Sequence, residues 1–408
     1  MPVWHNSVKD LVANKQLVVL GITQEQHPER CRLFAQWKQF DWPILQDPIN
    51  VMEATAVPII IAIDEFGIVR SSRPTPATFT ASFIEQTFAD VPDLVATPER
   101  YGPLAPPDFA ALRSAATENH SAADWATLGD ALTLWGDSTT LDESVNAYSA
   151  SVASADGEPK HRFRLGVALR RRYESDARQV TDFQEAVRSW TDALERDPNQ
   201  YIWRRRIEQY GPRLEKPYPF YDWVDEAEAA IRARGETPVE LNVRPAGAEL
   251  ASPAKSIAPA AAVDDPDPRG LVIRIEPGLI DSEVTVVPDR IKPGHAARVH
   301  VVLRPNPAAI DPVHWNNEAD PLRLHLSGPA DVTLSDLLLS HTPPEQLVSR
   351  EARRLEFEVQ IPDDAADTVE LAAYALFHVC DDDGGTCRFL RLDLPIRIPV
   401  KSSTASGN

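Results

Sequence analysis

The chain has 408 residues, of which 43% are hydrophobic and 25% charged, a composition typical of globular proteins with sizeable cores. At about 100 to 200 residues per domain, this length predicts several domains. The 41 basic and 61 acidic residues give a formal net charge of −20, which repels phosphate backbones and argues against nucleic acid as a partner. No apolar run reaches the length of about eighteen residues that a membrane-spanning helix needs, so no transmembrane segment is predicted.

The first predicted domain starts with a helical segment at residues 7–14 and a continuous apolar run at residues 16–22. Such a run is typical of a parallel strand that is buried on both faces. Residues 27–40 have apolar side chains at spacings of three and four, which predicts one face of an amphipathic helix. That face consists of Cys31, Leu33, Phe34 and Trp37.

A second apolar run, at residues 57–63, predicts another strand. The turn residues that follow it, Asp64 to Gly67, predict a hairpin into residues 68–70, with Gly67 supplying a positive φ. Residues 81–88 then predict a closing helix.

This order of elements resembles the thioredoxin-like fold of the TlpA and alkyl-hydroperoxide-reductase type, over residues 1–92. The matching segments are residues 16–23, Trp42 to Asp47, the cis-proline corner Ala56-Val57-Pro58 and the edge hairpin Asp64 to Arg70. In that family, a strand and a Cys-x-x-C dithiol directly precede the segment equivalent to Met1 to Lys15. The resemblance therefore implies a truncated domain without the first strand and the dithiol, and raises the question of where the gene begins.

Val57 and Pro58 are the candidate binding residues of this domain. A cis-proline of this family presents a strand edge to an extended substrate, so the corner can bind a chain even without a thiol. The alternative is a proline that only shapes the corner. Cys31 is interpreted as a small buried hydrophobe and not as a redox thiol.

Residues 93–107 are rich in proline and predict a linker, and residues 108–245 are helical in pattern. Trp125-Ala-Thr-Leu128-Gly129 resembles the opening of a tetratricopeptide repeat, and Leu-Gly recurs at Leu165-Gly166. The match is partial, so the sequence predicts a TPR-like helical region. Residues 204–206, three consecutive arginines, are predicted as a solvated face because the chain is acidic.

Residues 246–269 predict a disordered linker of low complexity, residues 270–400 an antiparallel β-sandwich, and residues 401–408 a disordered tail. The sandwich is predicted from seven short β-rich runs separated by turn residues. These runs are Leu271 to Ile275, Glu283 to Val287, Ala297 to Leu303, Arg323 to Leu326, Leu355 to Ile361, Ala372 to His378 and Arg388 to Pro399.

This part resembles the amino-terminal immunoglobulin-like domain of the disulfide-interchange protein DsbD. The likeness is carried by His314-Trp315-Asn316-Asn317-Glu318-Ala319, by Pro321-Leu322 and by the segment from Cys380 to Cys387. The fold class expected for the whole chain is thus a truncated α/β thioredoxin-like domain, an α-helical TPR-like region and an all-β immunoglobulin-like sandwich. The Trp-Asn-Asn-Glu segment is either a recognition patch or ordinary turn chemistry, and turn chemistry is favoured.

Cys380 and Cys387 are the candidate catalytic residues. Gly384-Gly385 permits a tight hairpin that brings the two sulfurs together, so a bridge is geometrically reasonable. One interpretation is a structural brace, worth roughly 2 to 3 kcal/mol for so short a loop. The other, implied by the resemblance to DsbD, is a disulfide that cycles and passes electrons to a partner. Three adjacent aspartates, residues 381–383, are expected to raise the thiol pKa and slow attack.

The leading hypothesis is a thiol-disulfide oxidoreductase or antioxidant-type protein of the thioredoxin superfamily, acting with other proteins. The competing hypothesis is a non-catalytic interaction scaffold. No metal site or cofactor is predicted, because the sequence has no phosphate-binding loop and no His-Glu-x-x-His motif. Both resemblances point to a periplasmic or other extracytoplasmic location, while the visible start has neither the basic nor the apolar region of a signal peptide.

Overall fold

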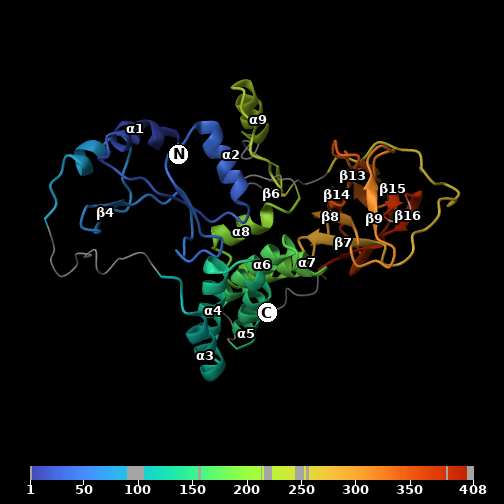
Figure 1. The fold of residues 1–408 in the computed structure, drawn as a ribbon, viewed down its shortest axis with the longest axis horizontal. Coiled ribbons are helices and arrows are strands. Elements are labelled where there is room, and N and C mark those ends of the chain that lie inside the picture. The colour runs from blue at the N-terminus through green and yellow to red at the C-terminus, as the bar shows by residue number, and fades with distance from the viewer. Residues whose placement is uncertain are drawn as a thin grey trace. The chain divides into compact units, whose positions relative to one another are not determined.

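The computed structural model describes residues 2–89, 105–154, 158–212, 214–215, 223–243, 252–253, 257–382 and 385–401. The chain divides into two compact units, which are considered separately (Figure 1). Unit 1 comprises Met1–Ala168, Ala193–Arg206 and Asp222–Arg244, and unit 2 comprises Leu169–Asp192, Ile207–Tyr221 and Pro245–Asn408. The fold contains both helices and antiparallel sheets. None of the described helices combines the length and the hydropathy that crossing a membrane requires.

Unit 1 begins with helices and short strands around a small apolar cluster that includes Val8, Trp42, Ala62 and Phe83. β1 pairs with β2 in parallel, and β3 pairs with β4 in an antiparallel hairpin. The elements are α1 (Pro2–Ala13), β1 (Gly21–Thr23), α2 (Pro28–Lys38), β2 (Ile44–Gln46), β3 (Ala62–Ile63), β4 (Val69–Ser71) and the π-helical η1 (Thr80–Ile84).

The prediction that residues 16–22 form a strand buried on both faces is wrong. Leu17 and Val19 pack against the cluster, but Val18 is 79% and Leu20 is 57% exposed, and only the end of the run pairs as a strand. A continuous apolar run predicts two buried faces only if a layer covers each face. Among the described residues, one face of this run has a layer and the other does not.

The predicted closing helix at residues 81–88 is also different in the structure. The helical turn spans Thr80–Ile84 and ends there. The hairpin after β3 is confirmed, and Asp64 is its organising residue. The Asp64 carboxylate accepts hydrogen bonds from the backbone N–H groups of Phe66 and Ile68, both at 2.9 Å, and from Nε of Arg70 at 2.6 Å.

Two α-helices of the middle region begin at side-chain caps. Asp108 accepts from the N–H groups of Ala110 and Ala111, and Ser121 caps the next helix through the N–H of Asp124. Gly129 lies within the second of these helices and directly faces Tyr148 of the next α-helix. The helices are α3 (Phe109–Asn119), α4 (Ala122–Trp135), η2 (Ser138–Thr140), α5 (Leu141–Ser154), α6 (Pro159–Tyr173), α7 (Asp182–Arg196), α8 (Tyr201–Glu208) and α9 (Trp223–Ala233).

Arg206 lies inside unit 1, so the prediction of a solvated face at residues 204–206 is wrong for this residue. Its side chain is 2% exposed. The guanidinium donates to the carbonyl oxygens of Gln24 and Pro48 and to the side chain of Gln26. A buried guanidinium needs such acceptors, and the loop after β1 supplies them. These hydrogen bonds join α8 to the segments that follow β1 and β2 within unit 1.

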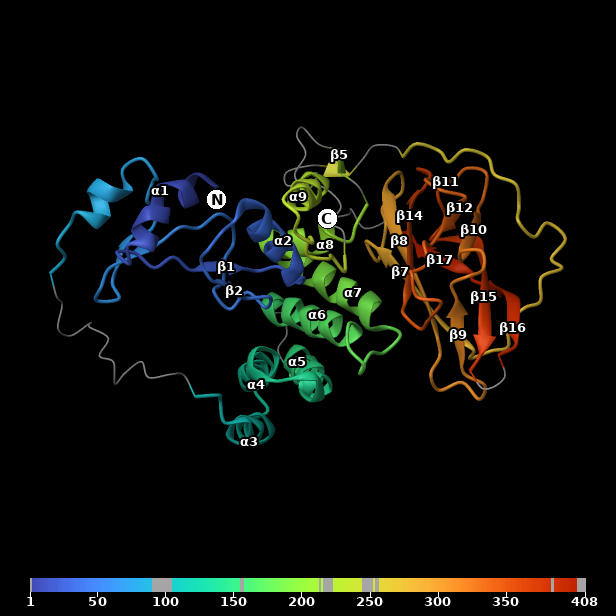
Figure 2. The same cartoon turned by 45° about the horizontal axis from the view of Figure 1, so that its top comes forward.

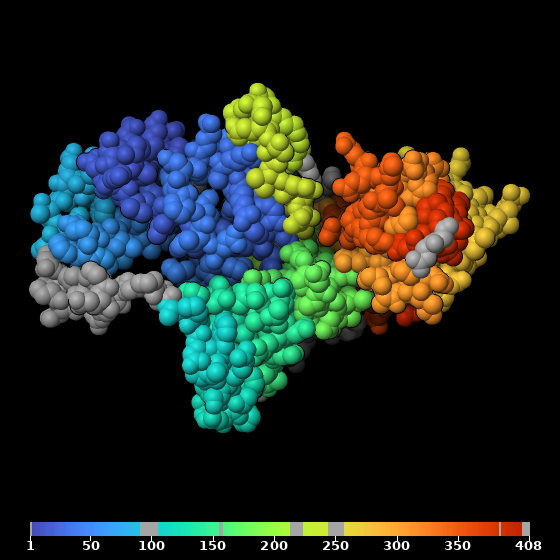
Figure 3. Space-filling view, in the orientation of Figure 1, coloured from blue at the N-terminus to red at the C-terminus, as the bar shows by residue number. Residues whose placement is uncertain are grey.

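Unit 2 contains two antiparallel sheets that share one hydrophobic core (Figure 2). The four-stranded sheet has the order β11-β14-β8-β7, and the seven-stranded sheet has the order β12-β10-β15-β9-β13, with β16 and β17 also pairing with β15. Buried apolar side chains fill the space between the two sheets. Figure 3 shows the outer surface of this region, coloured from orange to red. The strands are β7 (Ile280–Val287), β8 (Ala296–Pro305), β9 (Val313–Asn316), β10 (Arg323–Ser327), β11 (Thr333–Leu334), β12 (Leu338–Ser340), β13 (Val348–Ser349), β14 (Arg353–Gln360), β15 (Thr368–Asp381), β16 (Cys387–Asp393) and β17 (Ile396–Pro399), together with a small pair of β5 (Leu214–Glu215) and β6 (Ser252–Pro253).

The start of the two-sheet region lies earlier in the chain than residue 270. Ala260 donates its N–H to the carbonyl oxygen of Leu334, and the Asp267 carboxylate binds Arg391 at 2.8 Å. Residues 257–269 therefore pack on the sheets, and the predicted linker can apply only to the segment before them. Most of the predicted linker at residues 93–107, and residues 402–408 of the predicted tail, lie outside the described residues.

Candidate functional site

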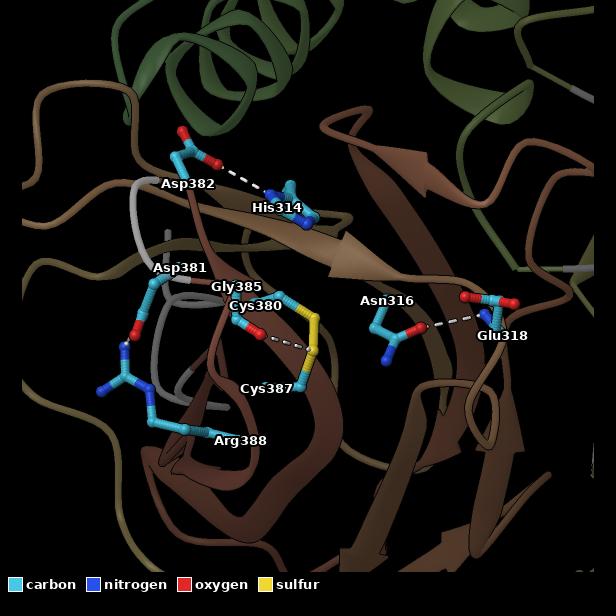
Figure 4. Close-up of a disulfide and its surroundings, with 9 residues drawn as sticks. All are labelled: His314, Asn316, Glu318, Cys380, Asp381, Asp382, Gly385, Cys387 and Arg388. Atoms are coloured by element: carbon cyan, nitrogen blue, oxygen red, sulfur yellow. Dashed lines mark hydrogen bonds and ion pairs between the residues drawn. A yellow bond between two sulfur atoms is a disulfide. The ribbon is translucent and has the colours of Figure 1, made fainter.

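The two candidate catalytic cysteines form a disulfide at the end of the β15–β16 hairpin (Figure 4). Cys380 and Cys387 are directly opposed in the two strands, with Cα atoms 4.0 Å apart. The neighbouring pair, Asp381 and Thr386, is joined by a backbone hydrogen bond of 3.0 Å. Hydrogen-bonded and non-hydrogen-bonded pairs alternate in an antiparallel ladder, so the cysteines occupy a non-hydrogen-bonded pair, where side chains approach most closely.

The two sulfur-bearing residues differ in their access to solvent. Cys380 is 6% exposed, whereas Cys387 is classed as exposed. Gly385 has a φ of 62°, a left-handed conformation that favours glycine, and it helps the chain turn beside the bridge. Cys387 is therefore the more solvent-accessible residue of the bridge.

The register of three strands places further side chains on the same face as the bridge. β9 pairs with β15 so that His314 is opposite Cys380. On the other side of β15, His378, two residues before Cys380, is opposite Phe389 of β16. The rings of His378 and Phe389 stack with their centroids 4.5 Å apart. The bridge is thus flanked by a histidine on one side and by a histidine–phenylalanine pair along the strands.

Two of the aspartates next to the bridge are neutralised by cations. Asp381 accepts from the guanidinium of Arg388 at 2.6 Å. Asp382 lies 2.7 Å from Nδ1 of His314 and 2.5 Å from the guanidinium of Arg350, and these two hydrogen bonds hold the pKa of the Asp382 carboxyl below its usual range. The sequence predicted that the aspartates slow thiol attack, but it did not identify the cations that pair with them. Which cation lies beside which aspartate depends on the register of the strands. Asp383 lies outside the described residues.

The Trp-Asn-Asn-Glu segment is a structural element of the sheet in this region. Trp315 is fully buried and donates its indole N–H to the carbonyl oxygen of Glu351 at 2.9 Å. The side-chain oxygen of Asn316 accepts from the N–H of Glu318 at 3.0 Å, which is an Asx turn. The segment therefore ends β9 and fixes the strand that carries His314.

Cys31 is a free thiol in unit 1. Its Sγ lies 3.1 Å from Oγ1 of Thr23, and burial raises the pKa of the thiol. A raised pKa lowers the fraction of reactive thiolate. This environment is that of a packed thiol.

Val57 and Pro58 are joined by a cis peptide bond in unit 1. Val57 is 43% exposed, and Pro58 is exposed as well. Ile59 and Ile61, which follow at alternate positions, are 56% and 47% exposed. The corner is therefore followed by a segment whose aliphatic side chains at alternate positions are exposed. None of the described residues covers this face.

No family model matches the sequence, and no curated protein matches it. Several solved structures align with part of the chain at low structural similarity. AvmM, which catalyses macrocyclization in alchivemycin A biosynthesis, is 11% identical, with 34% of this chain and 99% of that chain covered and a TM-score of 0.20. The yeast GGA1 GAE domain is 12% identical, with 30% and 96% covered and a TM-score of 0.18. The sporulation control protein Spo0M of Bacillus subtilis is 15% identical, with 31% and 50% covered and a TM-score of 0.15.

Proposed function

We propose that this protein exchanges thiols and disulfides with a partner protein through the Cys380–Cys387 bridge. The main support for this proposal is the asymmetry of the bridge, in which Cys387 is exposed and Cys380 is buried. An attacking thiolate must approach one sulfur along the S–S bond while the other leaves. An exposed sulfur at the end of a sheet meets that requirement, and a fully buried bridge would not.

The pairing of the nearby charges supports the same proposal. An incoming thiolate is an anion, and unpaired aspartates beside the bridge would repel it. Arg388 binds Asp381 and Arg350 binds Asp382, so the negative charges of these two described aspartates are offset beside the bridge.

A purely structural role explains less of the geometry. The bridge closes a short hairpin whose strands already pair along the whole of β16, and the core between the two sheets is extensive. Chain-entropy arguments give such a loop roughly 2 to 3 kcal/mol. We infer that the two-sheet region stays folded when the bridge is reduced, as a cycling disulfide requires.

The sequence resemblances fit this proposal. We propose that residues 1–92 are thioredoxin-like, that residues 108–245 are TPR-like helices, and that the two-sheet region is an immunoglobulin-like sandwich of the DsbD type. On this reading the protein works with other proteins in an oxidising, extracytoplasmic compartment, where disulfides persist.

The proposal is tested by equilibrating the native protein in glutathione buffers of graded redox poise and trapping free thiols with a maleimide before mass spectrometry. A redox-active bridge opens and re-forms reversibly within the range of glutathione. A bridge that stays closed in fully reduced glutathione until the protein is unfolded would show that it is a structural brace.

A second candidate function is the binding of an extended protein segment in unit 1. The observation that favours it is the alternating exposed face formed by Val57, Ile59 and Ile61, whose backbone extends beyond the paired part of β3. An extended aliphatic segment could add to such an edge. The test is the binding of a fluorescent peptide with alternating valine and threonine, measured by anisotropy. Ile61→Asp should weaken this binding at least about tenfold. Ile310→Asp is the control and should not weaken it, because Ile310 is 98% exposed at a position outside this face. Equal binding to both variants would exclude this face.

A further inference from the structure

His314 is the side-chain neighbour of Cys380 in the seven-stranded sheet. The two residues are opposed in the β9–β15 ladder, and the flanking backbone hydrogen bond runs from Asp382 to Pro312 at 3.2 Å. Directly opposed residues of an antiparallel pair point to the same face, with Cβ atoms about 5 Å apart. The imidazole and the buried sulfur therefore share one face of the sheet (Figure 4).

Asp382 holds the His314 ring in one orientation, and Arg350 in turn holds the Asp382 carboxylate. Nδ1 of His314 lies 2.7 Å from Oδ1 of Asp382, and Oδ2 of Asp382 lies 2.5 Å from the guanidinium of Arg350. An ionised carboxylate can only accept, so Nδ1 carries a hydrogen. Nε2 is then the nitrogen that can gain or lose a proton, as in other sites where a carboxylate orients a catalytic imidazole.

We propose that His314, oriented by Asp382, is the proton donor to Cys380 when the bridge is opened. This inference rests on the proposed function and assigns the roles of its two sulfurs. A thiolate of a partner dithiol protein attacks Sγ of Cys387 and forms a mixed disulfide. The S–S bond breaks, its electron pair goes to Sγ of Cys380, and Nε2 of the His314 imidazolium transfers its proton to that sulfur.

The second half of the exchange completes the balance. The second thiol of the partner attacks the mixed disulfide, the partner leaves with its own disulfide, and Cys387 is released as a thiolate. Two electrons have then passed from the partner dithiol to Cys380 and Cys387. The burial of Cys380 makes this assistance necessary, because a thiolate that forms in a poorly solvated position is costly unless a cation or proton donor is close.

The test is the rate at which dithiothreitol opens the bridge in the full-length protein, expressed per dithiothreitol thiolate, at about pH 6 and about pH 9. His314→Gln should react at least about tenfold more slowly than the wild type near pH 6, where the imidazolium supplies the proton, and equally fast near pH 9. Asp382→Asn should show a smaller loss with the same pH dependence. His325→Gln is the matched control, because His325 lies on β10 of the same sheet and contacts Tyr374 instead.

The outcomes separate the two proposals. If the wild-type bridge opens and His314→Gln follows the same pH profile, the role of His314 is overturned while the exchange function stands. An equal slowing at both pH values would also overturn it, because it would indicate a structural effect on β9. If dithiothreitol cannot open the wild-type bridge at either pH in the folded protein, both proposals fail. Far-UV circular dichroism of each variant establishes that the fold is retained.

Discussion

His300 and Glu356 are opposed on β8 and β14 and form an ion pair, with Nδ1 of His300 3.0 Å from Oε1 of Glu356. The other ring nitrogen, Nε2, lies 2.7 Å from the carbonyl oxygen of Tyr210. Each ring nitrogen of this buried histidine therefore has an oxygen atom within hydrogen-bond distance. The pair joins the four-stranded sheet to the segment after α8 within unit 2.

Glu356→Gln should therefore destabilise unit 2 near neutral pH. Desolvation raises the pKa of the Glu356 carboxyl, but the interactions with His300 and Arg298 outweigh it and lower that pKa from 4.5 to about 2. A carboxyl whose pKa is depressed by folding stabilises the protein above its unfolded pKa, and the stabilisation is lost as pH falls toward the folded pKa. We expect a loss of about 1 to 3 kcal/mol at pH 7 that shrinks between pH 4.5 and 2.

Urea unfolding at several pH values, followed by far-UV circular dichroism, measures this effect. The control is Glu370→Gln, because Glu370 pairs with Arg397 at the surface, where both side chains are more than two-thirds exposed. Such pairs contribute about 0 to 1 kcal/mol. A loss for Glu356→Gln that does not change with pH would show that the carboxylate charge is not what stabilises the sheet.

Gly129 allows α4 and α5 to pack closely, and Gly129→Ala should break that contact. A Cβ at this position would lie 2.7 Å from Cε1 of Tyr148, whose ring is fully buried and whose hydroxyl binds Asp130 at 2.8 Å. The ring has no free space to move into, so overpacking should cost about 1 to 3 kcal/mol. In the control Gly211→Ala, the nearest atom to the added Cβ is 3.6 Å away.

Thermal unfolding of the two glycine variants provides the comparison. Gly211→Ala should remain within about 0.5 kcal/mol of the wild type, as most substitutions without a clash do. If Gly129→Ala were as stable as the wild type, the Leu-Gly pair in α4 would have no packing role. The repeat-like Leu-Gly motif would then have no explanation in helix packing.

The sequence predicted many of the helices and later strands, because their periodic patterns are local. It predicted the α2 face, the hairpin at Asp64 and most strands of the two sheets. It missed the short strands β9, β11, β12 and β13. The predicted strand Leu271 to Ile275 is wrong, because this segment forms only an isolated bridge at Arg274. The pairing of His314 with Cys380 joins residues that are far apart in the chain, and nothing in a local pattern marks that contact.

Buried charge was the other feature that local reasoning could not reach. Arg206 was assigned to solvent because three arginines in an acidic chain normally lie on the surface. The acceptors that make its burial possible come from the loop that contains Gln24 and Pro48. Arg350 has an exposed side chain, and sequence reasoning missed it because its partner Asp382 lies in the β15–β16 turn, far away in the chain.

The three cysteines should give a distinctive pattern of thiol labelling. In the native, non-reduced protein only Cys31 is a thiol, and burial raises its pKa, so a maleimide should react with it slowly. Unfolding without reduction should expose one thiol for each chain, and unfolding with reduction should expose three. Mass spectrometry of the labelled protein counts them. Rapid labelling of Cys380 and Cys387 in the native, non-reduced protein would contradict both the bridge and the proposed exchange.

Arg353 holds the face of Trp315, and Arg353→Ala should loosen β9. The guanidinium carbon lies 4.4 Å from the Trp315 ring centroid, the guanidinium donates to the side-chain oxygen of Asn317, and the residue is 1% exposed. Truncation removes this packing and leaves a cavity beside the indole, at a cost of about 3 kcal/mol. Arg353→Met fills most of the volume without the charge and should recover part of the loss.

The same variants connect stability to the redox site, because Trp315 directly follows His314 in β9. Urea unfolding followed by circular dichroism measures stability, and the rate of bridge opening by dithiothreitol near pH 6 measures the site. Arg353→Ala should lower both, whereas Arg397→Ala, at a side chain that is 75% exposed, should lower neither. If Arg353→Ala lost stability but opened the bridge at the wild-type rate, the position of His314 would not depend on the packing of Trp315, and the strand would be fixed by its backbone pairing with β15 alone.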